Sequence, residues 1–480
     1  MELNPNYIKE NLDKIGINEA IILLKEWILN SDDLNSRKKA LEILGSIDDN
    51  KNFKFFEQLF LSDENLDIRI ITGKILKKKY LKHRTIVPLL EFTLFNINSF
   101  EQKFLAVEIL NAINTQESRK IIQKYLKRFI KTNLQHKIED FPKEIFKKEN
   151  YFSISQFILD ICFNLILYDY YVNFCGYSVT LHNGFIILLN CEGSNLKSIG
   201  DIAALNKLIN LEHFLLKRNN IEKIEGLENL EKLKTLNLSD NNIKKIENLQ
   251  ELKKLEELDL SYNKIRIIEN LDSLIYLKKL SLEVNLITYI DSLDNLTNLE
   301  ELNLNNNKIT EIRNLNSLVR LKKLNFSYNK IEKIIGLEKL KNLLFLYLND
   351  NNISKVEGLE NLHELKTLNL SNNFIQKVEN LDNLKNLRKL EFSNNKIEKI
   401  EGLNNQFNLK ELFLDNNRIK NLEGMINLKN LIILFIENNE ISEFNVQKIE
   451  NLKNLNFIFL NGNPLTPDSW LCYKRRTRYP

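Results

Sequence analysis

Asparagine recurs at every twenty-second position through the second half of the chain. Eleven asparagines stand in phase, and a twelfth follows after a step of 24 residues. Each closes a pattern L-x-x-L-x-L-x-x-N-x-I, as at residues 233–243 and 299–309. A period this regular indicates a chain built from stacked copies of one small unit. The asparagines are Asn219, Asn241, Asn263, Asn285, Asn307, Asn329, Asn351, Asn373, Asn395, Asn417, Asn439 and Asn463.

Each unit is predicted to contain one short strand. Side chains alternate across a strand, so we expect the fourth and sixth pattern positions to point inward and the third, fifth and seventh outward. The asparagine is then carried inside as the strand ends, where its amide must bond backbone groups of its own turn and of the neighbouring turn. Stacking such units gives a curved solenoid with a parallel sheet on its concave face.

A second column, seven positions after each asparagine, predicts a fixed backbone bend. Its members are Gly226, Asn248, Asn270, Ser292, Asn314, Gly336, Gly358, Asn380, Gly402 and Gly424. Glycine and asparagine are the residues that best tolerate positive φ. We therefore expect the two to be interchangeable at this position, whereas a β-branched residue should weaken folding.

The repeat phrase resembles a known family. Residues 263–277 read Asn-x-Ile-x-x-Ile-Glu-Asn-Leu-x-x-Leu-x-x-Leu, and residues 351–365 follow the same phrase with Gly358 at the bend. This phrase resembles the 22-residue class of leucine-rich repeats found in the nuclear and cytoplasmic regulatory subunit of protein phosphatase-1. The resemblance covers residues 186–465 and implies an α/β leucine-rich-repeat solenoid of about 12–13 repeats. It also implies a phosphatase catalytic subunit as one candidate partner.

The ends of the repeat array are predicted to be caps. Residues 186–196 look like a degenerate first copy, and residues 466–480 are predicted to form a short C-terminal cap and basic tail because Asn463-Pro464-Leu465 with Tyr473-Lys474-Arg475 resembles the cap of several intracellular family members. The same repeat class resembles parts of small-ribonucleoprotein, axonemal and bacterial surface-adhesion proteins. The adhesion role would need an export signal, which residues 1–30 do not display.

Residues 1–150 are predicted to form an all-α domain. Three segments, 37–44, 69–76 and 103–110, align with steps of 32 and 34 residues, and each follows another apolar helical run. Paired helices at this period resemble HEAT-type repeats, and an irregular helical bundle is the alternative. Residues 151–185 are predicted to hold a connecting helix, buried rather than membrane-spanning, and a β-hairpin cap with an Asn183-Gly184 turn.

Composition excludes several functions. Sixty-eight Lys and Arg against 64 Asp and Glu give a net charge of +4, which provides no global field for nucleic acid or a membrane surface. Four sparse cysteines favour a reducing compartment, and we expect a cytoplasmic protein. Catalytic and phosphate-binding motifs are lacking, so we expect no enzyme activity, no cofactor and no metal. The histidines, predicted to be ordinary packing or surface residues, are His83, His136, His182, His213 and His363.

One end of the concave face is predicted to bind a partner. The central outward position is polar in the first repeats and aromatic in the last, which places an apolar patch where the repeat does not require one. The predicted partner-binding residues are Phe345, Tyr347, Glu391, Glu411, Phe413, Ile433, Phe435, Phe457 and Phe459. The alternative is that residues 466–480 or the partner subunit of a homodimer cover this patch.

We therefore expect a non-catalytic protein-binding scaffold or regulatory subunit that docks a protein on its concave face. One alternative is a regulator or enzyme, GTPase- or phosphatase-linked, with its activity in the helical half. Another is nucleic-acid binding by Lys-rich helices at residues 75–84 and 122–131.

Overall fold

The computed structural model describes residues 4–47, 51–134, 139, 141–146 and 155–477. The chain divides into two compact units, Met1–Ile186 and Ile187–Pro480, with the division inside one strand. His136 and parts of the expected 1–150 and 151–185 segments lie outside the described residues. Each unit is described by itself below.

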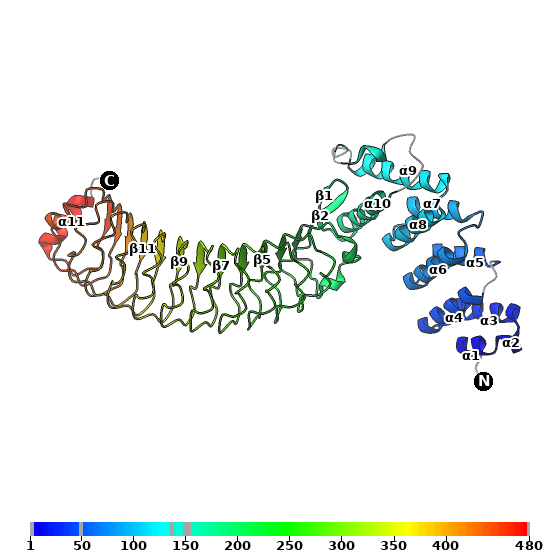
Figure 1. Cartoon of the computed structure of the whole chain (residues 1–480), viewed down its shortest axis with the longest axis horizontal. Coiled ribbons are helices and arrows are strands. Elements are labelled where there is room, and N and C mark those ends of the chain that lie inside the picture. The colour runs from blue at the N-terminus through cyan, green and yellow to red at the C-terminus, as the bar shows by residue number, and fades with distance from the viewer. Residues whose placement is uncertain (1–3, 48–50, 135–138, 140, 147–154, 478–480) are drawn as a thin grey trace. The chain divides into compact units, whose positions relative to one another are not determined.

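The first unit is helical, and its helices pack as consecutive pairs (Figure 1). Helix α3 packs on α4, α5 on α6 and α7 on α8, and the second helices α4, α6 and α8 pack on one another in turn. The 32–34-residue steps of the sequence correspond to these second helices. The helices are α1 (Pro5–Glu10), α2 (Leu12–Ile15), α3 (Ile17–Asn30), α4 (Leu34–Ile47), α5 (Phe53–Ser62), α6 (Leu66–Lys79), α7 (Ile86–Asn96), α8 (Phe100–Ile113), α9 (Gln116–Asn133) and the 3₁₀ turn η2 (Lys143–Ile145).

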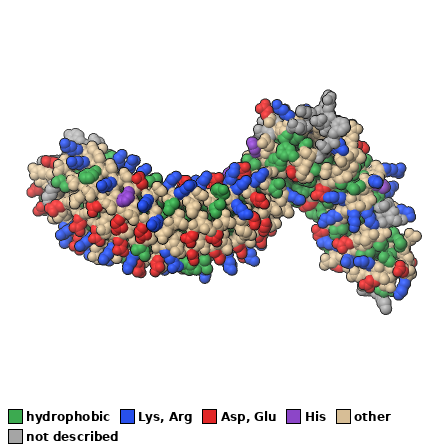
Figure 2. All heavy atoms as spheres, in the orientation of Figure 1, with side chains coloured by type: hydrophobic (Ala, Val, Ile, Leu, Met, Phe, Trp, Pro, Cys, Tyr) green, Lys and Arg blue, Asp and Glu red, His purple; other side chains and the backbone are tan. Residues whose placement is uncertain are grey.

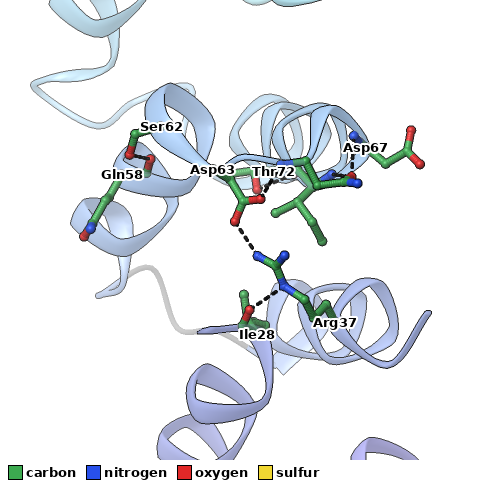
Figure 3. A network of polar contacts seen from close by, with 9 residues as sticks. Ile28, Arg37, Gln58, Ser62, Asp63, Asp67 and Thr72 are labelled. Carbon is green, nitrogen blue, oxygen red and sulfur yellow. Dashed lines mark hydrogen bonds and ion pairs between the residues drawn. The ribbon is translucent and has the colours of Figure 1, made fainter. Parts of the chain in front are cut away.

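An arginine joins two of these pairs (Figure 3). The Arg37 guanidinium, at the start of α4, lies 2.6 Å from the carboxylate of Asp63 and donates a second hydrogen bond, of 2.7 Å, to the carbonyl of Ile28. Asp63 sits in the turn between α5 and α6, and its side chain is only 6% exposed. A carboxylate so far removed from water requires this ionic partner. The contact fixes the second helix pair against the first.

The Lys-rich segment 75–84 is not one helix, contrary to the expectation from sequence. Helix α6 ends at Lys79, and the chain then turns, with Tyr80 buried and the ring of His83 stacked on Phe53 at 3.8 Å. The helix ends here because Tyr80 and His83 pack against other residues. The spacing of the lysines carries no information about this packing. In the other Lys-rich segment, Lys124 of α9 pairs with Glu91 at 2.7 Å.

A helix and the first strand of a hairpin complete the first unit, which ends within the second strand. Helix α10 (Gln156–Asp169) runs on into the π-helical turn η3 (Tyr170–Phe174), and this stretch is long and apolar enough to cross a membrane, with 44% of its most apolar window buried within the protein. Asn164 accepts a 2.9 Å hydrogen bond from the Ile186 amide. Strands β1 (Ser178–His182) and β2 (Phe185–Asn190) are joined by Asn183 and Gly184, both at positive φ as a tight hairpin turn requires.

The second unit is a curved β-solenoid whose strands line the concave side (Figure 1). From β2 to β14 each strand pairs in parallel with the next, and equivalent repeat positions face each other, as in Leu368 against Leu390. The strands are β3 (His213–Leu215), β4 (Thr235–Asn237), β5 (Glu257–Asp259), β6 (Lys279–Ser281), β7 (Glu301–Asn303), β8 (Lys323–Asn325), β9 (Phe345–Tyr347), β10 (Thr367–Asn369), β11 (Lys389–Glu391), β12 (Glu411–Phe413), β13 (Ile433–Phe435) and β14 (Phe457–Phe459). Short 3₁₀ turns are η4 (Ile199–Asp201), η5 (Leu205–Lys207) and η6 (Val446–Ile449).

The asparagine column lies inside the coils. Asn307, 8% exposed, donates through Nδ2 to the carbonyls of Leu282, Leu304 and Asn305 at 2.9–3.2 Å, and its Oδ1 accepts from the Ile287 amide at 3.0 Å. Each asparagine thus ties its own turn to the preceding repeat. The last one, Asn463, donates through Nδ2 to the carbonyls of Ile436 and Leu460, accepts from the Ile441 amide, and is less buried.

The bend residues all have positive φ, between 54° and 94°. Glycine and asparagine are nevertheless not interchangeable at every repeat. Asn270 donates from Nδ2 to the Ile246 carbonyl of the preceding coil at 2.7 Å, whereas a Cβ placed on Gly358 would lie 2.2 Å from the equivalent carbonyl of Ile334. The coils approach more closely at this glycine. Backbone separation, which the repeat pattern does not encode, decides which residue fits.

The seventh pattern position also differs from expectation. Ser239, Ser261, Ser327 and Ser371 are buried rather than outward-facing. The Ser239 hydroxyl donates to Asn237 Oδ1 at 2.6 Å, and the same oxygen accepts the Ser239 amide. The short side chain folds back onto the fifth position, and this local turn removes it from solvent.

Helix α11 (Pro467–Thr477) closes the C-terminal end of the solenoid. The hydroxyl of Tyr473 accepts from the Leu460 amide and donates to the Ile458 carbonyl, each at 3.3 Å. These backbone groups belong to β14 and its end, the last strand of the sheet. The helix therefore covers a strand edge that would otherwise be open to pairing.

Candidate functional site

Three phenylalanines form a stacked row across the last three strands. Phe413 of β12 faces Phe435 of β13, which faces Phe459 of β14. Their ring centroids are 5.0 and 4.2 Å apart, with interplanar angles of 9° in both pairs. The parallel register brings equivalent positions together, so the 22-residue period itself stacks the rings. We call Phe413, Phe435 and Phe459 the aromatic row.

The aromatic row is extended by a second apolar pair. Ile433 and Phe457 lie side by side two residues earlier on β13 and β14. Phe457 is 48% exposed, and the other four members of the patch are half-buried because they shield one another. Five of the nine sequence-predicted site residues are thus contiguous on one end of the concave sheet.

Acidic residues border the row. Glu391 of β11 faces Phe413, and Glu411 of β12 faces Ile433. The structure separates Phe345 and Tyr347 from this group, because both lie on β9, three strand spacings from β12. At about 4.8 Å per spacing the gap is about 14 Å. Those two residues form a second aromatic pair beside Thr367 and Asn369.

Two polar features beside the row were not foreseen from sequence. Lys389 pairs with Glu391 at 2.9 Å, and its ammonium lies 5.0 Å from the centre of the Phe413 ring. Asp415 accepts hydrogen bonds from the Glu437 amide at 2.9 Å and the Ser393 hydroxyl at 3.2 Å. Burial, aided by the nearby Glu437 carboxylate, raises the pKa of Asp415 above its ordinary value. An alignment of the repeats by position would have placed Lys389 and Asp415 next to the aromatic row.

A hollow of about 290 Å³ lies on the same concave face nearer its start. It spans β4 to β8 and is lined by leucines of the strands, such as Leu258, and by polar and charged residues that include Glu257, Lys279, Ser281 and Asn303. Lys279 pairs with Glu257 at 2.8 Å. The residues that line this hollow include no aromatic side chain, which distinguishes it from the aromatic row.

The C-terminal helix contacts the edge beside the row. Described residues of α11 touch β14 through Tyr473, whose ring also meets Phe444 at 6.1 Å. Phe435 and Phe459 keep part of their surface exposed. The described part of α11 therefore leaves the outward surface of the row accessible in a single chain.

In the described part of the chain, no group of three or more His, Cys, Asp or Glu side chains could hold a metal ion. His213 faces the Thr235 hydroxyl at 3.1 Å, and His83 stacks on Phe53. Burial raises the pKa of the Cys162 thiol, which lies wholly inside the helical unit. These are packing roles.

The repeats match a family of known proteins. The model for leucine-rich repeats (2 copies) matches residues 209–250, 231–273, 277–317, 319–361 and 363–405. No curated protein matches the sequence. Among solved structures, an internalin (InlF) from Listeria monocytogenes is 31% identical, with a TM-score of 0.54 over 58% of this chain and 82% of that one. The chain belongs to the leucine-rich repeat family.

A second solved structure is a leucine-rich repeat protein from Leptospira interrogans. It is 26% identical, with a TM-score of 0.51 over 59% of this chain and 80% of that one. Both likenesses cover little more than half of this chain. Leucine-rich repeat proteins generally mediate protein–protein interaction, using the long concave surface that stacked repeats create.

Proposed function

We propose that the chain is a non-catalytic scaffold or regulatory subunit that binds a protein partner at the aromatic end of its concave face. The observation that carries this proposal is the stacked, partly exposed row Phe413–Phe435–Phe459 with Ile433 and Phe457 beside it. Aromatic residues are enriched in the cores of protein interfaces, where a few residues carry most of the binding energy, and here nothing in the repeat requires them.

The test compares two double variants of the full chain. Phe413→Ala with Phe435→Ala should lower affinity for a captured partner by about 2 kcal/mol or more, roughly 30-fold, while the fold is retained. The matched control, Ser281→Ala with Asn303→Ala, changes equivalent outward positions on β6 and β7 and should cost little. Partners are first captured from lysate and identified by mass spectrometry, and affinities are then measured with the purified partner.

Loss of binding in the serine–asparagine control, with none in the phenylalanine variant, would move the site to the polar hollow over β4–β8. If the phenylalanine variant lowers the melting temperature instead of the affinity, the row is a structural stack that supports the end of the solenoid. If the unaltered chain sediments as a dimer and the phenylalanine variant as a monomer, the partner is a second copy of the chain.

The partner's identity is a narrower proposal. A phosphatase catalytic subunit is the first candidate to test, on the strength of the repeat phrase alone, in a reducing cytoplasmic setting that suits four free cysteines. HEAT-like pairing of the helices in the first unit is supported by the packing of α3 to α8, and makes that unit a second candidate protein-binding surface. Turnover by the purified chain would contradict the non-catalytic proposal.

A further inference from the structure

The residues that immediately precede the strands form a charge ladder with a break in it. From β3 to β8 the order is Glu212, Lys234, Glu256, Lys278, Glu300, Lys322. All three lysines pair with the glutamate of the preceding repeat, each at 2.7 Å: Lys234 with Glu212, Lys278 with Glu256 and Lys322 with Glu300. Alternating charges in neighbouring coils make this part of the ladder self-neutralising.

The alternation stops after β8. The next four members of the ladder are Leu344, Lys366, Arg388 and Lys410. The backbone keeps its register, because the Arg388 amide donates to the Lys366 carbonyl and the Lys410 amide to the Arg388 carbonyl, both at 2.8 Å. We call Lys366, Arg388 and Lys410 the cation row.

The cation row is uncompensated within the described residues, where none of its three members forms an ion pair. Arg388 and Lys410 are exposed and Lys366 is half-buried. Like charges on directly neighbouring strands destabilise a sheet. Figure 2 shows positive and negative side chains interleaved over most of the solenoid surface in that view, so three adjacent cations depart from the general pattern.

We propose that the cation row docks an acidic segment of a protein partner. Its members span two strand spacings, about 10 Å, and carboxylates at successive i, i+3 and i+4 positions of a helix have a similar spacing of about 5–6 Å. Lys410 directly precedes β12, the strand that carries Phe413, and the ammonium of Lys389, the residue after Arg388, lies 5.0 Å from the centre of the Phe413 ring, so the two rows share this repeat. The inference rests on the proposed protein-binding function for the nature of the partner.

A polyphosphate is the less suitable ligand. Glu391, Glu411 and Asp415 lie on the same strands or at their ends and would repel a nucleic-acid backbone that extended beyond the row. A protein segment can place acidic residues against the cation row and apolar or basic ones against the rest of the face. Electrostatic complementarity of this kind sets the orientation of a bound partner.

The test uses poly-L-glutamate as the probe and two triple variants with the same change in net charge. Lys366→Gln, Arg388→Gln and Lys410→Gln together should weaken binding of the labelled probe at low salt about tenfold, the combined effect of three exposed ion pairs. Lys234→Gln, Lys278→Gln and Lys322→Gln change the paired part of the ladder and should weaken it less than about twofold. Melting curves establish that both variants are folded.

Equal losses in the two triple variants would overturn the proposal, because net charge alone would then explain binding. Tighter binding of an oligothymidylate than of poly-L-glutamate would also overturn it, in favour of nucleic acid. Phe413→Ala with Phe435→Ala should leave probe binding unchanged. If that variant loses the protein partner while the cation-row variant keeps it, the proposed function stands and this inference fails.

Discussion

Asn307 illustrates how one buried amide joins two repeats. Replacing it with alanine should lower the free energy of unfolding by about 1–3 kcal/mol, because the buried Ile287 amide would lose its acceptor and the Leu282 carbonyl would keep only the bond from Asn285. Denaturant unfolding of the full chain measures the change. Lys308→Ala, at the exposed neighbouring position, is the control and should be nearly neutral. Equal stability of the two variants would contradict a structural role for the amide.

Two glycines at the same bend position should respond differently to one substitution. Gly226→Asn should be mild, because φ is 72° and no atom lies within 4 Å of the added Cβ. Gly358→Asn should be costly, because its φ of 69° is similar but the Cβ would lie 2.2 Å from the Ile334 carbonyl. Melting temperatures of both variants test this. Equal effects would mean that φ alone governs the bend.

At the scale of elements, α11 protects the last strand. Tyr473→Phe removes a hydroxyl that bonds both the Leu460 amide and the Ile458 carbonyl. We expect faster hydrogen exchange at the Leu460 amide and a loss of about 1 kcal/mol. Tyr328→Phe, at an exposed tyrosine elsewhere on the solenoid, should change neither quantity. Unaltered exchange at Leu460 would show that the helix does not guard this edge.

The elements differ in how well sequence predicts them. The second helices of the pairs and the strands recur at fixed spacing, so their existence follows from periodicity. The end of α6 at Lys79 does not, because Tyr80 and His83 pack against Phe53, a residue on another helix. A tertiary contact overrides the local run of lysines.

For the whole molecule, stacked repeats imply stability that depends on nearest neighbours. Deleting residues 308–329 removes one full repeat and places Lys330 directly after Asn307, so the pattern continues in phase. The shortened chain should stay folded, with a melting temperature lower by about 2–4 °C for each kcal/mol lost. Circular dichroism during heating measures both.

Deleting only residues 319–329 gives the matched control. It removes half a repeat and takes away the strand and asparagine of one coil, which leaves the neighbouring coils unpaired. We expect this chain to lose the solenoid beyond the deletion. Similar stability for the two deletions would contradict the nearest-neighbour view.

The candidate site was predictable only in part. The positions of Phe413, Phe435 and Phe459 follow from counting in steps of the repeat, because a parallel register puts equivalent positions side by side. The same counting places Phe345 and Tyr347 too far from them to share one patch. The cation row was equally readable from the sequence, but its significance depends on the ion pairs that the other lysines of the ladder make.

The sequence alone determined the solenoid, its phase and its inward-facing residues, because every repeat makes the same contacts with the next and one unit therefore specifies them all. Tertiary structure decided the rest. It set how closely the coils approach at Gly358, that Ser239 turns back to Asn237, that Tyr473 closes the last edge, and that Arg37 reaches Asp63. These contacts each occur where local geometry departs from the average repeat or where no repeat exists, and a periodic pattern carries no information about such departures.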